Sequence, residues 1–165
     1  MDFYMKKDIR KCGRFCIMFF FTGFLLFFIA QSGVFGYRWA FQLAGISSFT
    51  AGIYLTVRYL LKDYLVSVTG RTEYDLDLVV TEIQKNRKFA VCRIRVADIS
   101  NVKIVGRGEK RRETAPKYTF DYRSEFLPDK YILIRAEDSG ENILLKISYN
   151  KELYDFLIKI REKQI

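Results

Sequence analysis

The chain has 165 residues, a formal net charge of +9 and no histidine, so it is long enough for one ordinary domain together with a membrane anchor. The lack of histidine excludes Ser-His-Asp and Cys-His nucleophile pairs and any metal site with a histidine ligand. Residues 62–165 hold 21 Lys and Arg against 17 Asp and Glu. This excess is too small for a dedicated nucleic-acid-binding domain, so nucleic acid is not an expected partner.

The first 61 residues divide into a charged arm and a long apolar stretch. Residues 1–14 carry five Lys and Arg against two Asp and are predicted to form a basic cytoplasmic arm, whereas residues 15–61 carry only Arg38 and Arg58. Two runs within this stretch each supply about 20 residues without charge, which is the length that a helix needs to cross a bilayer. We therefore predict two transmembrane helices, at about 15–36 and 39–61.

Flanking cations predict the orientation of this helical hairpin. Lys and Arg occur in the arm and after the second run, while residues 31–37 carry none. The positive-inside rule then puts both termini in the cytoplasm and the connecting turn outside, as in a multi-pass protein of the cell membrane. A cleaved signal peptide is the alternative, because Ala30-Gln31-Ser32 resembles a cleavage site. The first run is long for a signal peptide, however, and a second run follows at once.

Small residues recur every fourth position in the second helix. They share one face, where another helix could approach closely. The partner could be the first helix of the same hairpin, a second copy of the chain, or a helix of another protein. The predicted packing residues are Ala40, Ala44, Ser48 and Gly52.

After residue 61 the apolar residues alternate with polar ones, as in half-buried strands. At the end of the chain the period changes, because Leu153, Phe156, Leu157 and Ile160 have the spacing of an amphipathic helix, with Asn150 as its N-cap. The predicted strands are 62–69, 74–80, 89–96, 101–105, 118–122, 130–136 and 142–148.

Residues 62–165 are therefore predicted to form a mainly β domain of the α+β class, a bent antiparallel sheet or partly open barrel of about seven strands with a C-terminal helix. This order resembles the pleckstrin-homology (PH)-like superfold. Two spanning helices that lead straight into such a domain resemble bacterial membrane proteins with a cytoplasmic PH-like domain. The resemblance is carried by VADISNV at 96–102 and KYILIRAEDSGENILLKISYNKELYDFLIKI at 130–160. It implies an architecture but neither a catalytic motif nor a particular ligand.

The three cysteines, Cys12, Cys16 and Cys92, have the spacing of neither a disulfide framework nor a zinc site. We expect unpaired thiols in a reducing compartment, and lipidation of the first two remains an open alternative.

Other motifs give little sign of chemistry. The segment 106–108 (GRG) lacks the spacing of a phosphate-binding loop, and Asp75 and Asp77 have no third oxygen ligand spaced as in a calcium loop. We predict no catalytic residue, cofactor, metal or small-molecule substrate.

Basic residues gather in two loops. They could be ordinary solvated side chains, or they could contact an anionic lipid surface or an acidic partner, since each cation close to such a leaflet is worth about 1 kcal/mol. The candidate contact residues are Arg107, Lys110, Arg111, Arg112 and Lys117 in one loop and Lys85, Arg87 and Lys88 in the other.

The leading hypothesis is a non-enzymatic, membrane-anchored binding or scaffold module. Its domain would contact anionic lipid headgroups or a protein partner at the inner face of the membrane. The alternative is an accessory subunit of a larger membrane protein complex, recruited through the second transmembrane helix. A homo-oligomer through the membrane helices is also compatible with the small-residue face.

Overall fold

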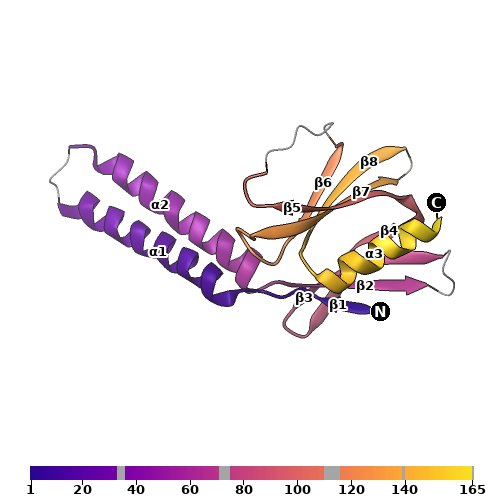
Figure 1. Cartoon of the computed structure of the whole chain (residues 1–165). Coiled ribbons are helices and arrows are strands. Elements are labelled where there is room, and N and C mark those ends of the chain that lie inside the picture. Colours follow the sequence, from indigo (N-terminus) through magenta and orange to yellow (C-terminus); the bar gives the residue numbers. More distant parts are fainter. Residues whose placement is uncertain (33–35, 71–74, 110–115, 139, 165) are drawn as a thin grey trace. The chain divides into compact units, whose positions relative to one another are not determined.

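The computed structural model describes residues 1–32, 36–70, 75–109, 116–138 and 140–164 (Figure 1). The chain forms two compact units. One consists of Asp8–Leu61, and the other combines Met1–Lys7 with Lys62–Ile165. The short N-terminal segment therefore belongs to the same unit as the C-terminal two thirds of the chain.

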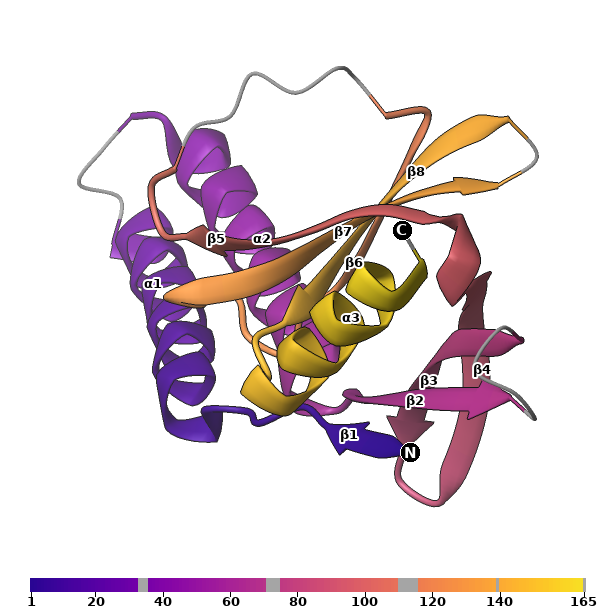
Figure 2. The ribbon, with the colours of Figure 1, turned by 45° about the vertical axis from the view of Figure 1, so that its right-hand side comes forward.

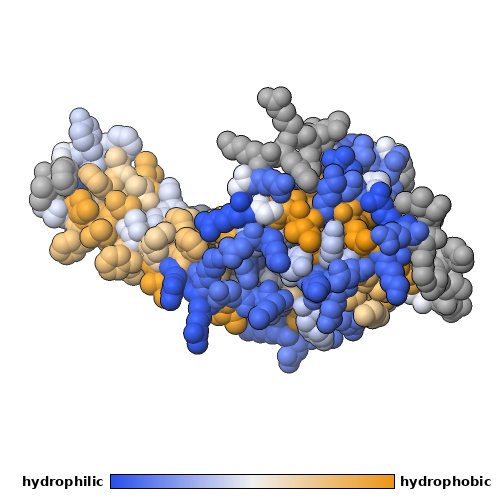
Figure 3. Space-filling model, in the orientation of Figure 1, coloured by the Kyte–Doolittle hydropathy of each residue, from blue (hydrophilic) through white to orange (hydrophobic). Residues whose placement is uncertain are grey.

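The first unit is a helical hairpin. It contains α1 (Ile9–Ser32), α2 (Arg38–Leu55) and a single π-helical turn, η1 (Thr56–Leu60). By length and composition, Ile9–Ser32 and Arg38–Leu60 are both able to cross a membrane. Only 17% of the most apolar window of each helix is buried, so most of these side chains lie on the surface, where Figure 3 shows them as apolar. A core helix of a water-soluble protein would instead be mostly buried.

Glycines allow the two helices to approach closely. A Cβ atom at Gly45 of α2 would lie 2.8 Å from the ring of Phe27 on α1, which is closer than ordinary packing permits. A Cβ atom at Gly23 of α1 would lie 3.1 Å from the ring of Phe49 on α2. The bulky residues of each helix therefore fill the space above the glycines of the other, as expected where dispersion forces drive helix packing.

The second unit contains two four-stranded sheets. Sheet A has the order β1-β2-β3-β4 and is antiparallel throughout. Sheet B has the order β5-β7-β8-β6. The strands of sheet A are β1 (Asp2–Tyr4), β2 (Asp63–Gly70), β3 (Leu76–Gln84) and β4 (Arg87–Arg95). Those of sheet B are β5 (Ile99–Gly106), β6 (Tyr118–Tyr122), β7 (Lys130–Asp138) and β8 (Glu141–Ser148).

The core of this unit lies between the sheets and the C-terminal helix. A short 3₁₀ helix, η2 (Val96–Asp98), connects the two sheets, and α3 (Lys151–Gln164) packs between them (Figure 2). Fully buried side chains come from both sheets and from the helix, including Val80, Ile134 and Leu153. At the start of α3, Asn150 accepts a hydrogen bond from the backbone N–H of Leu153, at 3.1 Å, and so caps the helix.

The α+β class is confirmed, with three helices and eight strands among the described residues. The predicted bent antiparallel sheet or partly open barrel of about seven strands differs from the structure in two respects. The strands form two sheets, and β6 pairs with β8 in parallel, with Tyr118 opposite Ile143 near the start of β8. The backbone N–H of Lys117 donates to the carbonyl of Asn142 at that end, at 3.1 Å.

The strand that was not predicted, β1, lies within residues 1–14, the segment predicted above to form a basic arm. β1 pairs with β2, and Phe3 is only 2% exposed in the core. The helix α1 then begins at Ile9, six residues before the apolar run, so its first turns carry the cations Arg10, Lys11 and Arg14.

Candidate interaction surfaces

The basic loop at residues 85–88 lies at one particular end of sheet A. Tyr4 is opposite Leu65, Asp63 is opposite Ile83, and Ile83 is opposite Lys88. The last residue of β1, the first residue of β2 and the β3–β4 turn therefore share one end of the sheet. Both covalent connections to the helical hairpin leave the domain at this same end, which we call the basic end of sheet A.

Some of the charge at the basic end is neutralised within the domain. Lys7 Nζ lies 2.8 Å from the carboxylate of Asp63 and also donates to the backbone carbonyl of Lys62. Lys62 in turn lies 2.9 Å from the carboxylate of Glu82. These two pairs fix the segments where the chain enters and leaves the sheet.

Three cations remain at the tip of the β3–β4 hairpin. Lys85, Arg87 and Lys88 are exposed, and none of them forms an ion pair within the part of the chain that the structure describes. Lys85 adopts a left-handed backbone conformation, with φ of 53°, which closes the tight turn between the strands. The tip of the hairpin therefore presents three solvated positive charges.

The second basic loop does not join the first. Its described cations belong to sheet B, since Arg107 follows β5 and Lys117 precedes β6, whereas the β3–β4 turn belongs to sheet A. Arg107 is fixed by its backbone N–H, which donates to the carbonyl of Asp129 at 2.9 Å. Lys117 pairs with Glu141 and lies over the ring of Tyr118. Lys110, Arg111 and Arg112 lie outside the described residues.

Strand β6 carries an aromatic ladder that sequence reasoning did not identify. The rings of Tyr118 and Phe120 stack with centroids 6.4 Å apart, and those of Phe120 and Tyr122 with centroids 6.3 Å apart. Tyr122 also packs against Tyr64 of β2, at 5.7 Å, so the ladder starts in the core. At its other end Tyr118 is 45% exposed and Phe120 is 39% exposed. The alternation YTFDY was the available signal, because residues at i and i+2 share a face.

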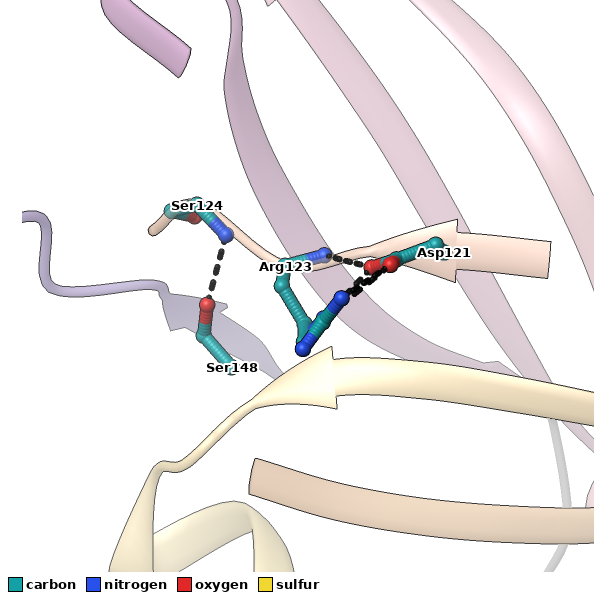
Figure 4. Close-up of polar contacts among 4 residues, drawn as sticks. All are labelled: Asp121, Arg123, Ser124 and Ser148. Atoms are coloured by element: carbon teal, nitrogen blue, oxygen red, sulfur yellow. Dashed lines mark hydrogen bonds and ion pairs between the residues drawn. The ribbon is translucent and has the colours of Figure 1, made fainter. Parts of the chain in front are cut away.

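A polar cluster fixes the chain after β6 (Figure 4). The guanidinium of Arg123 donates to both carboxylate oxygens of Asp121, with Nε at 2.8 and 3.0 Å. The backbone N–H of Ser124 donates to Ser148 Oγ, at 2.7 Å. Ser124 is 1% exposed, and its own hydroxyl has no hydrogen-bond partner among the described residues. This contact between β8 and the segment after β6 sets the position of the edge strand.

The small-residue face of α2 divides between two environments. Ser48 Oγ donates to the carbonyl of Phe19 on α1, at 2.7 Å, and a Cβ atom at Gly52 would lie 3.3 Å from the ring of Phe20. Ala40 is half-buried, whereas Ala44 is exposed. Two of the four residues therefore contact α1 of the same hairpin, and the exposed Ala44 does not join them in a single surface.

The cysteines and carboxylates form no obvious reactive centre. Cys12, Cys16 and Cys92, all within the described residues, form no disulfide bond. Burial raises the pKa of the Cys92 thiol, and a hydrogen bond with Tyr122 partly offsets this effect. Asp77 pairs with Arg93 on the neighbouring strand. No group of three or more Cys, Asp or Glu side chains suited to a metal ion occurs among the residues that the structure describes.

Comparison with known proteins gives no relative. No family model, no curated protein and no solved structure matches this chain. The function must therefore be argued from the surfaces described above.

Proposed function

We propose that this protein is a non-enzymatic, membrane-anchored binding module whose basic end of sheet A contacts anionic lipid headgroups. Its two long helices would cross the membrane, and both termini and the β domain would lie on the cytoplasmic side. The observation that carries the proposal is the position of Lys85, Arg87 and Lys88. These cations share one end of the sheet with both connections to the helical hairpin.

The covalent chain supports this proposal independently of charge. Only Leu61 and Lys62 separate the end of η1 from the start of β2. Three Cα–Cα steps of 3.8 Å limit the distance between Leu60 and Asp63 to about 11 Å. If Arg38–Leu60 crosses the membrane, this short link would hold that end of the sheet near the lipid surface.

The charges have the sign and size that such a contact needs. Each cation near an anionic leaflet contributes about 1 kcal/mol, so three give roughly 3 kcal/mol before any loss from ordering. That is enough to select one orientation for a domain that is already tethered. Because the Debye length is about 8 Å at physiological salt, the attraction acts only at close range.

The orientation follows from the positive-inside rule. Arg10, Lys11 and Arg14 lie in the first turns of α1, and Arg58 lies in the last turn before β2. Positive charge therefore flanks the two ends of the hairpin that lead into the domain, as is typical of cytoplasmic ends.

We also propose that the domain is PH-like. Two sheets followed by a C-terminal helix that buries Leu153 and Leu157 against the core are compatible with that superfold. The parallel pairing of β6 with β8 and the added strand β1 would then be features particular to this chain.

The test uses the full chain in lipid nanodiscs, of neutral lipid alone or with anionic lipid added. Hydrogen exchange measured by mass spectrometry should slow at residues 84–88 only in the anionic discs, and added salt should reverse the effect. Reversing the charge of Lys85, Arg87 and Lys88 to Glu should abolish the protection.

A matched variant changes the net charge by the same amount elsewhere. Lys103, Arg107 and Lys159 are exposed and lie outside the basic end, and changing them to Glu should leave the protection at 84–88 in place. Equal exchange at 84–88 in neutral and anionic discs would refute lipid contact. An acidic protein surface would then be the remaining ligand for these cations.

A further inference from the structure

The two sheets have four edge strands, and three of them carry features that prevent pairing with another chain. β1 has only three residues. β4 has an irregular register between Val80 and Thr81 of its partner strand and carries exposed Arg and Lys side chains. β5 has an irregular register between Ile99 and Asn101. Short length, bulges and cations are the usual protection of a sheet edge.

Strand β6 lacks this protection. Its register with β8 is regular over all five residues, and it contains no Lys, Arg, Pro or Gly. Three of the five residues are aromatic, and Tyr118, Thr119 and Phe120 are exposed. A regular, aromatic edge whose one charged residue is Asp121 is the kind that accepts another strand.

We propose that β6 pairs with β6 of a second copy of this chain, antiparallel and with Thr119 on the two-fold axis. A regular antiparallel self-pairing places one residue opposite its own copy. With Thr119 at that position, Lys117 lies opposite Asp121 of the second copy, and Tyr118 lies opposite Phe120. Each contact occurs twice, and both are favourable cross-strand pairs.

Charge selects this register over the one that places Phe120 on the axis. If Phe120 were on the axis, Lys117 would lie opposite Arg123 of the second copy. This pair of positive charges would occur twice and would disfavour the dimer. The side chains of Lys117 and Asp121 now contact Glu141 and Arg123 within the same chain. Lys117 keeps 56% of its side chain exposed and so can reach a second carboxylate.

The pairing also suits a membrane protein. A two-fold contact closes on itself and gives a dimer rather than a fibre. Anchoring in a bilayer raises the effective concentration of the second copy, so the five-residue segment 117–121 can suffice. The contact is independent of the basic end of sheet A, and its failure leaves the lipid proposal unaffected.

The test is disulfide crosslinking of the full chain in proteoliposomes, in a background where the native cysteines are changed to Ala. Thr119→Cys should give a crosslinked dimer on mild oxidation, since opposed residues in antiparallel strands have Cα atoms about 4.5–5.5 Å apart, within disulfide reach. Lys103→Cys, exposed on the other edge of the same sheet, is the matched control and should remain monomeric.

Charge reversal tests the register. Adding Lys117→Glu to the Thr119→Cys chain should lower crosslinking by roughly two- to thirty-fold, because two favourable cross-strand pairs become repulsive. Adding Asp121→Lys as well should restore it. Equal crosslinking at positions 119 and 103, or no recovery in the double reversal, would overturn the proposal.

Discussion

The phenol of Tyr122 on β6 donates a hydrogen bond to the backbone carbonyl of Val91 on β4, at 3.3 Å. The two residues belong to edge strands of different sheets. This bond joins the sheets at the point where the aromatic ladder enters the core. It therefore connects the proposed dimer strand to the rigid part of the domain.

Changing Tyr122→Phe should leave the ring stack intact and remove only this hydroxyl. We expect the free energy of unfolding to fall by about 1–3 kcal/mol, because the hydroxyl contacts both the Val91 carbonyl and the Cys92 thiol, and each hydrogen bond has a net worth of about 0.5–1.5 kcal/mol. Chemical denaturation of the full chain in detergent measures this loss. A fall of several kcal/mol would mean that the ring, and not the hydroxyl, had lost its contacts.

The same tyrosine affects Cys92. Burial raises the pKa of the thiol above its ordinary value, and the hydrogen bond with Tyr122 lowers it. Because only the thiolate is alkylated, the reaction of Cys92 in the folded protein should rise at higher pH than in the unfolded chain. Tyr122→Phe should move the profile further toward alkaline pH. Peptide mapping after iodoacetamide treatment at a series of pH values measures the alkylation of Cys92. A shift of the profile toward acidic pH in Tyr122→Phe would show that the hydroxyl does not lower the pKa of the thiol.

The segment before α1 should matter to the stability of the domain. Phe3 is 2% exposed and packs against Phe156 of α3, with ring centroids 5.9 Å apart, whereas the adjacent Tyr4 is 67% exposed. Phe3→Ala should cost about 3–5 kcal/mol of unfolding free energy, as for other buried Phe side chains. Tyr4→Ala, measured in the same denaturation experiment, should cost far less. Similar losses at both positions would show that β1 does not contribute its Phe to the core.

The close approach of α1 and α2 at Gly23 and Gly45 leads to a further prediction for the helical hairpin. Gly45→Ala would bring a Cβ atom to 2.8 Å from the ring of Phe27, so the helices must separate or the ring must move. We expect a loss of about 1–3 kcal/mol, the usual cost of overpacking. Ala44→Leu, one residue away but exposed, should be almost neutral in SDS-titration unfolding. A larger loss at Ala44 would mean that α1 packs on a different face of α2.

Periodicity predicted most elements because their apolar residues are regularly spaced. The strand predicted at 62–69 is β2 at Asp63–Gly70, and the amphipathic spacing around Leu153 and Leu157 corresponds to α3. β1 was not predicted because its three residues are too few to show an alternation of apolar and polar side chains, and the five cations that follow indicate an exposed arm. The parallel pairing of β6 escaped because a single sequence gives the strands but not their neighbours.

The helix face shows a similar limit. Residues spaced by four drift about 40° per step around a helix with 3.6 residues per turn. Ala44 therefore turns away from the line of Ser48 and Gly52. The face that contacts α1 follows Gly45, Ser48 and Gly52, with spacings of three and four. The basic loops were identified from composition, but only the strand register shows which loop shares an end with the connections to the helical hairpin.

The most direct test of lipid contact is photo-crosslinking from position 86, between Lys85 and Arg87 in the β3–β4 turn. p-Benzoylphenylalanine would be placed there in the full chain, in nanodiscs that contain anionic lipid, with position 103 as the control. We expect anionic-lipid adducts at 86 that greatly exceed those at 103 and that decline as salt is added. Equal yields at the two positions, unaffected by salt, would contradict the account.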